Sequence, residues 1–502
     1  MYVDDSVVLS QAYNIKNIPF EFFNWLQLRY VGLKSFYLSD LLGQDLKVVH
    51  LVSIFIHLLN GIFIYLILKQ VSFNKWGAFF IVGLWLIHPL NSQAVIYMSQ
   101  RFTLVSTLFL LLSVNLLLYI KNGKFNLYKN KSYIINSVLL LSALFFFLLS
   151  LFSKQSAAFL PIYVAFYLMF FSHKRKLASL FVISSIILLV VTLSVNESLL
   201  AKLDSLTRET TSYTRLDYFA TQLKVVLIYL SKTVVPVNFT LESSIEVIKF
   251  NSSEFYKFLL IHVAIILFFI GLYKYKKDSR LLVGLSFFYF SMVVESSFIP
   301  IQDLYFEHRM YLPSAAALMV IVLTLSYIQP LILKIKLNKN VVFIPVFALL
   351  SYLTYNRVLM WQEPLVFYKN EYTQNPMSTR AMSSYGKELA KSGDKEKALE
   401  LLLRSFNTEL KQGIVRQATL VGLLTVLIDL NYYQDALNLG RRAIQLTQSR
   451  PKLQALVYAH LALVYFEMKQ CGFAKGWSKK ALSLDSSVTL AKQLINLCGN
   501  TK

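Results

Sequence analysis

Residues 298–313, FIPIQDLYFEHRMYLP, place four polar side chains between two long apolar runs. These side chains are Asp303, Glu307, His308 and Arg309. A charged group at membrane depth costs about 2.5–3.5 kcal/mol on insertion scales. The stretch must therefore be a loop between two spans or line a wet cavity. We expect this stretch and the other polar loops to meet on one face of a membrane protein.

The composition supports a membrane class. The chain has 502 residues, 56% of them hydrophobic, and a mean hydropathy of +0.53. Apolar runs recur between residues 48 and 356, and about 20 residues suffice to span a bilayer as a helix. The predicted spans are 48–69, 76–90, 102–121, 133–152, 157–172, 177–195, 255–273, 281–297, 312–328 and 340–356.

The basic residues orient these spans. The net charge of +23 does not indicate nucleic-acid binding, because the lysines and arginines cluster in short loops between spans. Loops rich in lysine and arginine face the cytoplasm. The alternate loops with such runs are 69–75, 121–131, 174–176, 274–280 and 334–339. The 196–254 loop, residues 298–313 and everything after residue 357 are then predicted to lie outside.

The sequence contains few cysteines and histidines that could form disulfides or bind metals. Cys471 and Cys498 predict neither a disulfide framework nor a metal site, and the histidines lack ligand spacing. His50, His57 and Asn60 share one face of the first predicted span, where we expect them to bond across helices. Contact with a lipid pyrophosphate is the alternative. His88 precedes Pro89, which suggests a kink at a helix end.

A repeat follows a linker at 357–378. Alanines recur 38 residues apart, and a small residue follows each of them seven positions later. These positions are Ala398, Ala436 and Ala474, followed by Ser405, Ala443 and Ala481. Small residues at this spacing let antiparallel helices approach closely, so residues 379–496 are predicted to form three tetratricopeptide-like repeats. Such stacks bind proteins or peptides. A passive structural cap is the alternative.

Several segments together resemble a known family. In order, they are HPLNSQAVIYMSQR (88–101), SKQSAAFLP (153–161), RLDYFATQLKVVLIYLSKTVVPVN (215–238), the 298–313 stretch and the C-terminal repeats. This order resembles bacterial relatives of the transmembrane-and-tetratricopeptide-repeat O-mannosyltransferases. The resemblance implies an all-α fold, with a polytopic membrane helix bundle of GT-C type over 48–356 and a soluble repeat solenoid after it.

The resemblance also implies site residues. An acidic pair in the first external loop, residues 1–47, supplies the catalytic carboxylate, here Asp4 and Asp5. Arg29 corresponds to a following arginine of that loop, whereas Tyr30 stands where the family usually has proline. Gln93 and Gln155 occupy positions where animal members carry glutamate, so neither is expected to be the essential base. The family has one span before the acidic pair, and we expect a missing first span here.

The cationic candidates lie at the external ends of spans, where a lipid headgroup sits. They are Arg101, Lys154, His308 and Arg309, and we expect them to bind the donor phosphate. Snorkelling of these side chains for structural reasons is the alternative. Glu307 is expected to orient or pair with His308 or Arg309. His88 is a supporting residue.

The resemblance implies transfer of a sugar from a polyprenyl-phosphate donor to a hydroxyl of a protein or surface glycan. The reaction would occur on the outer face of a bacterial cytoplasmic membrane, with the repeats binding the acceptor. No cofactor or metal is implied, although external acids leave a divalent cation open. The alternatives are an oligosaccharyltransferase or ligase with a pyrophosphate donor and a non-catalytic scaffold. A transporter and a nucleotide-driven protein have no supporting motif.

Overall fold

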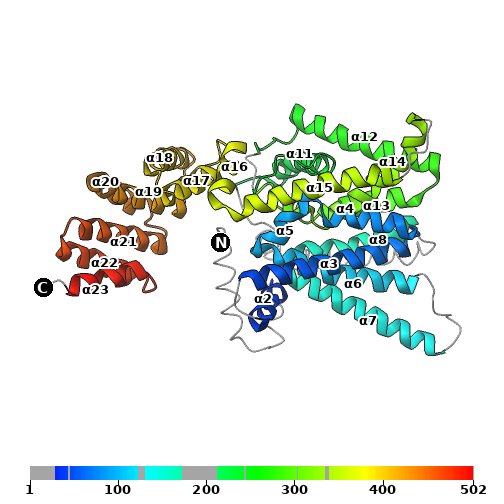
Figure 1. Cartoon of the computed structure of the whole chain (residues 1–502), viewed down its shortest axis with the longest axis horizontal. Coiled ribbons are helices and arrows are strands. Elements are labelled where there is room, and N and C mark those ends of the chain that lie inside the picture. Colours follow the sequence, from blue (N-terminus) through cyan, green and yellow to red (C-terminus); the bar gives the residue numbers. More distant parts are fainter. Residues whose placement is uncertain are drawn as a thin grey trace, which may run out of the picture. The chain divides into compact units, whose positions relative to one another are not determined.

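The computed structural model describes residues 29–42, 46–121, 130–171, 212–241, 245–301, 303–333 and 339–500 (Figure 1). Within these ranges every regular element is a helix. The chain divides into two compact units. The membrane unit ends at Val358, and the repeat unit begins at Leu359. The predicted all-α class is confirmed, and the arrangement expected of a GT-C bundle stays a prediction.

The described helices of the membrane unit include helices at nine of the ten predicted spans, and three others in segments predicted as loops. In chain order these are α2 (Tyr30–Leu42), α3 (Leu46–Gln70), α4 (Lys75–Leu86), α5 (Ser92–Ile96), α6 (Arg101–Lys121), α7 (Asn130–Ser153), α8 (Phe159–Phe171), α11 (Arg215–Val234), α12 (Ser253–Lys276), α13 (Ser279–Met292), α14 (Pro313–Leu333) and α15 (Lys339–Gln362). Short 3₁₀ turns connect some of them: η2 (Pro89–Asn91), η3 (Met98–Gln100), η4 (Gln155–Ala158) and η5 (Glu307–Met310).

Helix length separates two groups among the ten predicted spans. In the described part of the chain, five helices are long and apolar enough to cross a membrane, or up to six if a bent pair counts as one span. The five are Lys47–Gln70, Met98–Ile120, Ile134–Ser153, Ser253–Lys276 and Phe343–Gln362. Apolar helices within Gln155–Phe171, Ser279–Met292 and Pro313–Ile328 are shorter. The predicted span 177–195 lies outside the described residues.

The bent pair coincides with the kink predicted at His88 and Pro89. Lys75–Leu86 and Pro89–Ile96 meet at 53°. Pro89 cannot donate a backbone hydrogen bond to the preceding turn, so the helix ends before it. The Nδ1 atom of His88 accepts a hydrogen bond from the Leu90 amide at 3.2 Å, which caps the new turn.

A network of buried hydrogen bonds joins several helices of the membrane unit. His57 Nδ1 lies 2.7 Å from the Tyr311 hydroxyl, and Asn60 donates to that hydroxyl and to the Leu104 carbonyl, each at 3.1 Å. The indole of Trp85 donates to the Tyr311 carbonyl at 3.0 Å. His57 and Asn60 therefore bond across helices, as their shared face predicts. These bonds join α3, α4 and α6 to the residues that follow η5.

The repeat unit stacks antiparallel helix pairs. Its helices are α16 (Pro364–Gln374), α17 (Thr379–Lys391), α18 (Lys395–Lys411), α19 (Gln417–Asp429), α20 (Tyr433–Leu446), α21 (Pro451–Glu467), α22 (Cys471–Leu484) and α23 (Thr489–Asn500). All six small positions of the 38-residue pattern are fully buried. The predicted repeats are confirmed as helix pairs.

The backbone repeats with the same period. Gly393, Asn431 and Lys469 lie 38 residues apart, and each has a positive φ, of 97°, 62° and 61°. Each sits in the turn between the two helices of one repeat. Only the first position carries glycine, the residue for which a positive φ is easy. The geometry of this turn is thus preserved where the residue that signals it is not.

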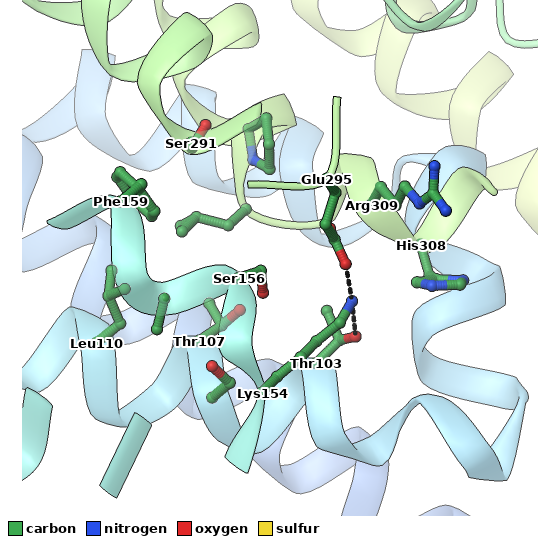
Figure 2. Close-up of a pocket in the computed structure, with 14 residues that line it drawn as sticks. Thr103, Thr107, Leu110, Lys154, Ser156, Phe159, Ser291, Glu295, His308 and Arg309 are labelled. Atoms are coloured by element: carbon green, nitrogen blue, oxygen red, sulfur yellow. Dashed lines mark hydrogen bonds and ion pairs between the residues drawn. The ribbon is translucent and has the colours of Figure 1, made fainter. Parts of the chain in front are cut away.

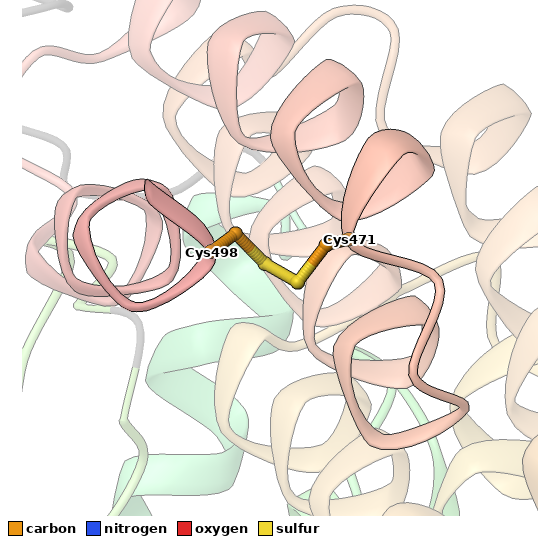
Figure 3. The surroundings of a disulfide bond; sticks show 2 residues. All are labelled: Cys471 and Cys498. Carbon is orange, nitrogen blue, oxygen red and sulfur yellow. A yellow bond between two sulfur atoms is a disulfide. The ribbon is translucent and has the colours of Figure 1, made fainter. Parts of the chain in front are cut away.

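The two cysteines form a disulfide, so the prediction that they form no disulfide framework was wrong (Figure 3). Cys471 begins α22 and Cys498 lies in α23, with 5.5 Å between their Cα atoms. They lie 27 positions apart along the chain. The stacking of α22 against α23 brings them together, and spacing alone does not reveal that contact.

Candidate functional site

A small cavity of about 30 Å³ collects polar side chains from four segments of the membrane unit (Figure 2). Thr103 comes from α6, Lys154 from the residue between α7 and η4, Glu295 from the turn after α13, and His308 with Arg309 from η5. Ser106, Thr107, Ser156 and Ser291 add hydroxyls to the lining. Three of the four predicted phosphate-binding residues therefore share one cavity.

Lys154 and Glu295 form the ion pair of this cavity. The Lys154 Nζ lies 2.9 Å from the Glu295 carboxylate and donates to the Thr103 hydroxyl at 3.2 Å, as Figure 2 shows. Their side chains are only 11% and 15% exposed. Burial opposes ionisation of Glu295, but Lys154 and Arg309 outweigh it and hold its pKa below the usual range. Burial lowers the pKa of Lys154, against the pull of Glu295.

Arg309 is held by uncharged groups. Its guanidinium donates to the backbone carbonyls of Asp303 at 2.7 Å and Leu304 at 3.3 Å. Within the described ranges no carboxylate lies within ion-pair distance of it. The two carbonyls fix the orientation of the Arg309 guanidinium, and no direct ion pair among the described residues balances its positive charge. Arg309 is therefore suited to bind an anionic ligand.

His308 is anchored by Gln93. The His308 backbone amide donates to Gln93 Oε1 at 2.6 Å, and the His308 Nδ1 lies 3.3 Å from the same oxygen. Burial, reinforced by the charges of Lys154 and Arg309, lowers the pKa of His308 well below its ordinary value. The imidazole is therefore neutral at pH 7. It can hydrogen-bond a ligand but adds no positive charge.

Glu307 points into a second polar cluster. Its carboxylate pairs with Arg357 of α15 and accepts hydrogen bonds from the Thr240 amide at 2.7 Å and the Tyr305 hydroxyl at 3.2 Å. Lys232 of α11 lies 3.6 Å away. The expected pairing of Glu307 with His308 or Arg309 is wrong. Successive side chains of a 3₁₀ turn project about 120° apart, so neighbours in η5 face different partners.

Arg101 lies outside the polar cavity. It is fully buried at the start of α6 and donates to the hydroxyls of Ser39 at 2.7 Å and Ser53 at 3.2 Å, and to the Val49 carbonyl. Its guanidinium also lies 4.3 Å from the centre of the Phe36 ring. These contacts join α2, α3 and α6. The role predicted for Arg101 in binding phosphate stays a prediction.

The supporting residues occupy separate positions. His88 is buried, and its Nε2 lies 3.1 Å from the Thr233 carbonyl, so it joins η2 to α11. Arg29 is exposed, lies 5.9 Å from the centre of the Phe102 ring and acts electrostatically on His308. Gln155 begins η4, next to Lys154. Asp4 and Asp5 lie outside the described residues.

Sequence reasoning missed three charged residues. Glu295 lies within the predicted span 281–297, where an acid inside an apolar run is itself a signal of a functional or buried site. Arg357 immediately follows the last predicted span, and Lys232 is one of many lysines in the chain. Nothing in the sequence around Arg357 or Lys232 indicates that they belong to a polar cluster, because their common partner Glu307 is distant in sequence.

An almost wholly apolar cavity of about 400 Å³ lies next to the polar one. Leu312 lines both. The apolar cavity is walled by α3, α6, α7, α8, α13 and α14, and Tyr163, Phe287 and Met319 are among its lining residues. A Cβ added at Gly284 would clash with the side chains of Met319 and Val320, so the glycine allows α13 and α14 to pack closely. Within the described residues no group of three or more His, Cys, Asp or Glu side chains is placed to hold a metal ion.

Comparisons with known proteins add little to this geometry. No family model matches the chain, and no curated protein matches it. Among solved structures, the yeast Tom70 crystal structure is similar at 12% identity and a TM-score of 0.22, covering 99% of this chain and 96% of that chain. A likeness of this strength carries no argument about fold or function.

Proposed function

We propose that the chain is a membrane glycosyltransferase that moves a sugar from a polyprenyl-phosphate donor to a hydroxyl acceptor. One observation supports the proposal most directly. A polar cavity with Lys154 and Arg309 adjoins a large apolar cavity, and Leu312 lines both. An amphiphile with an anionic head and a hydrocarbon chain matches this pair of cavities.

The polar cavity suits the leaving group of such a reaction. The acceptor oxygen attacks the anomeric carbon, the bond from that carbon to the phosphate oxygen breaks, and its electron pair leaves with the lipid phosphate. Charge therefore accumulates on the phosphate. Lys154 and Arg309 would stabilise it there, and His308 would add a neutral hydrogen bond.

The proton of the acceptor hydroxyl needs a base. The family resemblance assigns this role to Asp4 or Asp5, since a carboxylate beside another carboxylate has a raised pKa and so accepts a proton more readily. The repeat unit would bind the acceptor, as stacked helix pairs do.

The disulfide supports a location outside the cytoplasm for the repeats. Structural disulfides persist in oxidising compartments and are rare in the cytosol. The Cys471–Cys498 bond lies in the repeat unit, after the last apolar helix. The positive-inside assignment, which rests on other residues, proposes the same side. The membrane would be a bacterial cytoplasmic membrane.

The central test replaces both members of the acidic pair. Asp4→Asn with Asp5→Asn should abolish transfer from a labelled polyprenyl-phosphate sugar to acceptor by purified protein in lipid. Expression, membrane insertion and donor binding should be unchanged. Full activity of this double variant would overturn the assignment of the base.

The cavity is tested separately. Arg309→Lys keeps the charge and loses the two-pronged fork, and we expect kcat/KM to fall by about 10²-fold. Lys154→Met should cause a similar loss. Lys274→Met is the matched control, since Lys274 is exposed near the end of α12 in a loop assigned to the cytoplasm, and it should leave transfer unchanged.

Two rival functions give different results. A block-transferring ligase would use lipid-pyrophosphate donors and leave monophosphate donors unreacted, so single donors supplied to purified protein distinguish the two enzymes. A non-catalytic scaffold would tolerate Arg309→Lys and lose function when the repeats are deleted.

A further inference from the structure

The second helices of the repeats carry basic side chains at equivalent positions. These positions fall five and six residues after the buried alanines at 398, 436 and 474. Five of the six side chains are basic: Arg404, Arg441, Arg442, Lys479 and Lys480, which we call the basic stripe. All five are exposed. The sixth, Leu403, is 40% exposed.

The positive charge of the stripe is not balanced locally. In the described part of the repeat unit, none of its five members has a carboxylate within ion-pair distance. Ion pairs of this unit join other residues, such as Lys391 with Glu388 and Lys397 with Asp394. From Asp435 to Asp485 the chain has eight lysines and arginines and three acids, Asp435, Glu467 and Asp485. A solvated protein surface usually carries positive and negative side chains side by side. The surface of the basic stripe differs because positive side chains dominate it.

The stripe is separate from the layer expected to bind peptides. The first helices of the repeats, α17, α19 and α21, pack on one another. The stripe lies on the second helices, α18, α20 and α22. Repeat solenoids bind partners along the concave surface that their twist creates. Stripe binding therefore need not compete with an acceptor held by the first helices.

Apolar and aromatic side chains accompany the stripe on α22. Phe473 is 62% exposed and Leu484 is 38% exposed. The Lys480 ammonium lies 4.5 Å from the centre of the Trp477 ring. Helices that lie on membrane surfaces combine basic residues with exposed aromatic and aliphatic residues in this way.

We propose that the basic stripe binds the anionic headgroup surface of a lipid bilayer. Among the described residues, the last helix long and apolar enough to cross a membrane ends at Gln362, and α17 begins at Thr379, with the short helix α16 between them. Even fully extended, the 16 residues between them reach about 55 Å. The chain thus holds the stripe near a bilayer at a high effective concentration, an advantage that a soluble acidic partner lacks. This inference does not rest on the transfer reaction.

The test follows the depth of a spin label on α22 in the full chain. Ser483→Cys provides an exposed labelling site, with the native disulfide left intact. The protein is placed in nanodiscs of phosphatidylcholine alone or mixed with phosphatidylglycerol. In the anionic discs we expect access of a soluble nickel chelate to the label to fall at least about twofold. The access should recover in about 0.5 M salt, which shortens the screening length.

Two charge-matched variants make the result specific. Arg441, Arg442, Lys479 and Lys480 changed together to Gln should remove the protection. Lys391, Lys452, Lys469 and Lys492 changed together to Gln remove the same charge from exposed positions off the stripe and should keep it. Equal label access in both kinds of disc would overturn the proposal. So would protection by soluble dextran sulfate in neutral discs without protection by phosphatidylglycerol, because the partner would then be an acidic polymer.

Discussion

The membrane unit buries the Glu307–Arg357 ion pair, whereas the repeat unit buries small residues at its repeat positions and pairs exposed lysines with acids on α17 and α18. Glu307, Arg309 and Arg357 are each 5% exposed or less. In the repeat unit the alanines of the 38-residue pattern are fully buried, and the ion pairs of α17 and α18 include exposed lysines. A buried charge costs several kcal/mol unless it is paired and hydrogen-bonded. The membrane unit therefore depends on specific partners, and the repeat unit depends on shape.

Removing the Glu307 carboxylate should have the largest effect on stability. Glu307→Gln leaves Arg357 buried without its counter-charge, and we expect a loss of about 3–5 kcal/mol in the membrane unit. Thermal unfolding in detergent measures it. Lys391→Gln, which breaks an exposed pair, should leave the transition unchanged.

A paired replacement sharpens this contrast. Glu307→Leu combined with Arg357→Leu removes both charges, and apolar replacement of a buried pair is often neutral. The double variant should recover most of the lost stability. If it unfolds as readily as Glu307→Gln, pairing is not the reason for the loss.

The disulfide should have the next largest effect. Cys498→Ser opens a loop whose ends are 27 residues apart, which corresponds to about 3–4 kcal/mol in the chain-entropy treatment. Limited trypsin digestion should cut near α23 first in this variant. Wild-type protein treated with reductant is the control and should show the same cut.

Overpacking the alanine positions tests the role of shape in the repeat unit. Ala436→Leu inserts a larger side chain where the alanine is fully buried, and we expect a loss of about 1–3 kcal/mol. Unfolding of the repeats is followed by the same digestion assay. The exposed change Asn438→Leu on the same helix should have little effect.

We expect the smallest effect from the pH dependence of the ion pair between Lys154 and Glu295. The pKa of Glu295 is lowered in the folded protein, so its contribution to stability is present above the ordinary carboxyl pKa and is lost as pH falls through the lowered value. Thermal stability should therefore hold from neutral pH to about pH 5 and fall below about pH 4. Glu295→Gln should reduce this acid-dependent step, and an identical pH profile would contradict the pairing.

The comparison also explains which predictions succeeded. The alanine spacing predicted the repeats, because a regular stack imposes the same small side chains at every turn. Lys154 and Arg309, both predicted to lie at span ends, line one polar cavity, and their role in binding phosphate stays a prediction. The pairing of Glu307 was wrong because a 3₁₀ turn sends neighbouring residues in different directions. Glu295 was missed because it lies inside a run assigned to a span.

The sequence by itself determined the helical class, the positions of the described apolar helices and the period of the repeats. Each of these depends on local hydropathy or a fixed period, which neighbouring residues along the chain reveal. The tertiary structure alone decided that Glu295 meets Lys154, that Glu307 meets Arg357 and that Cys471 meets Cys498. Such contacts depend on how helices pack across long stretches of chain, and no local pattern records that packing.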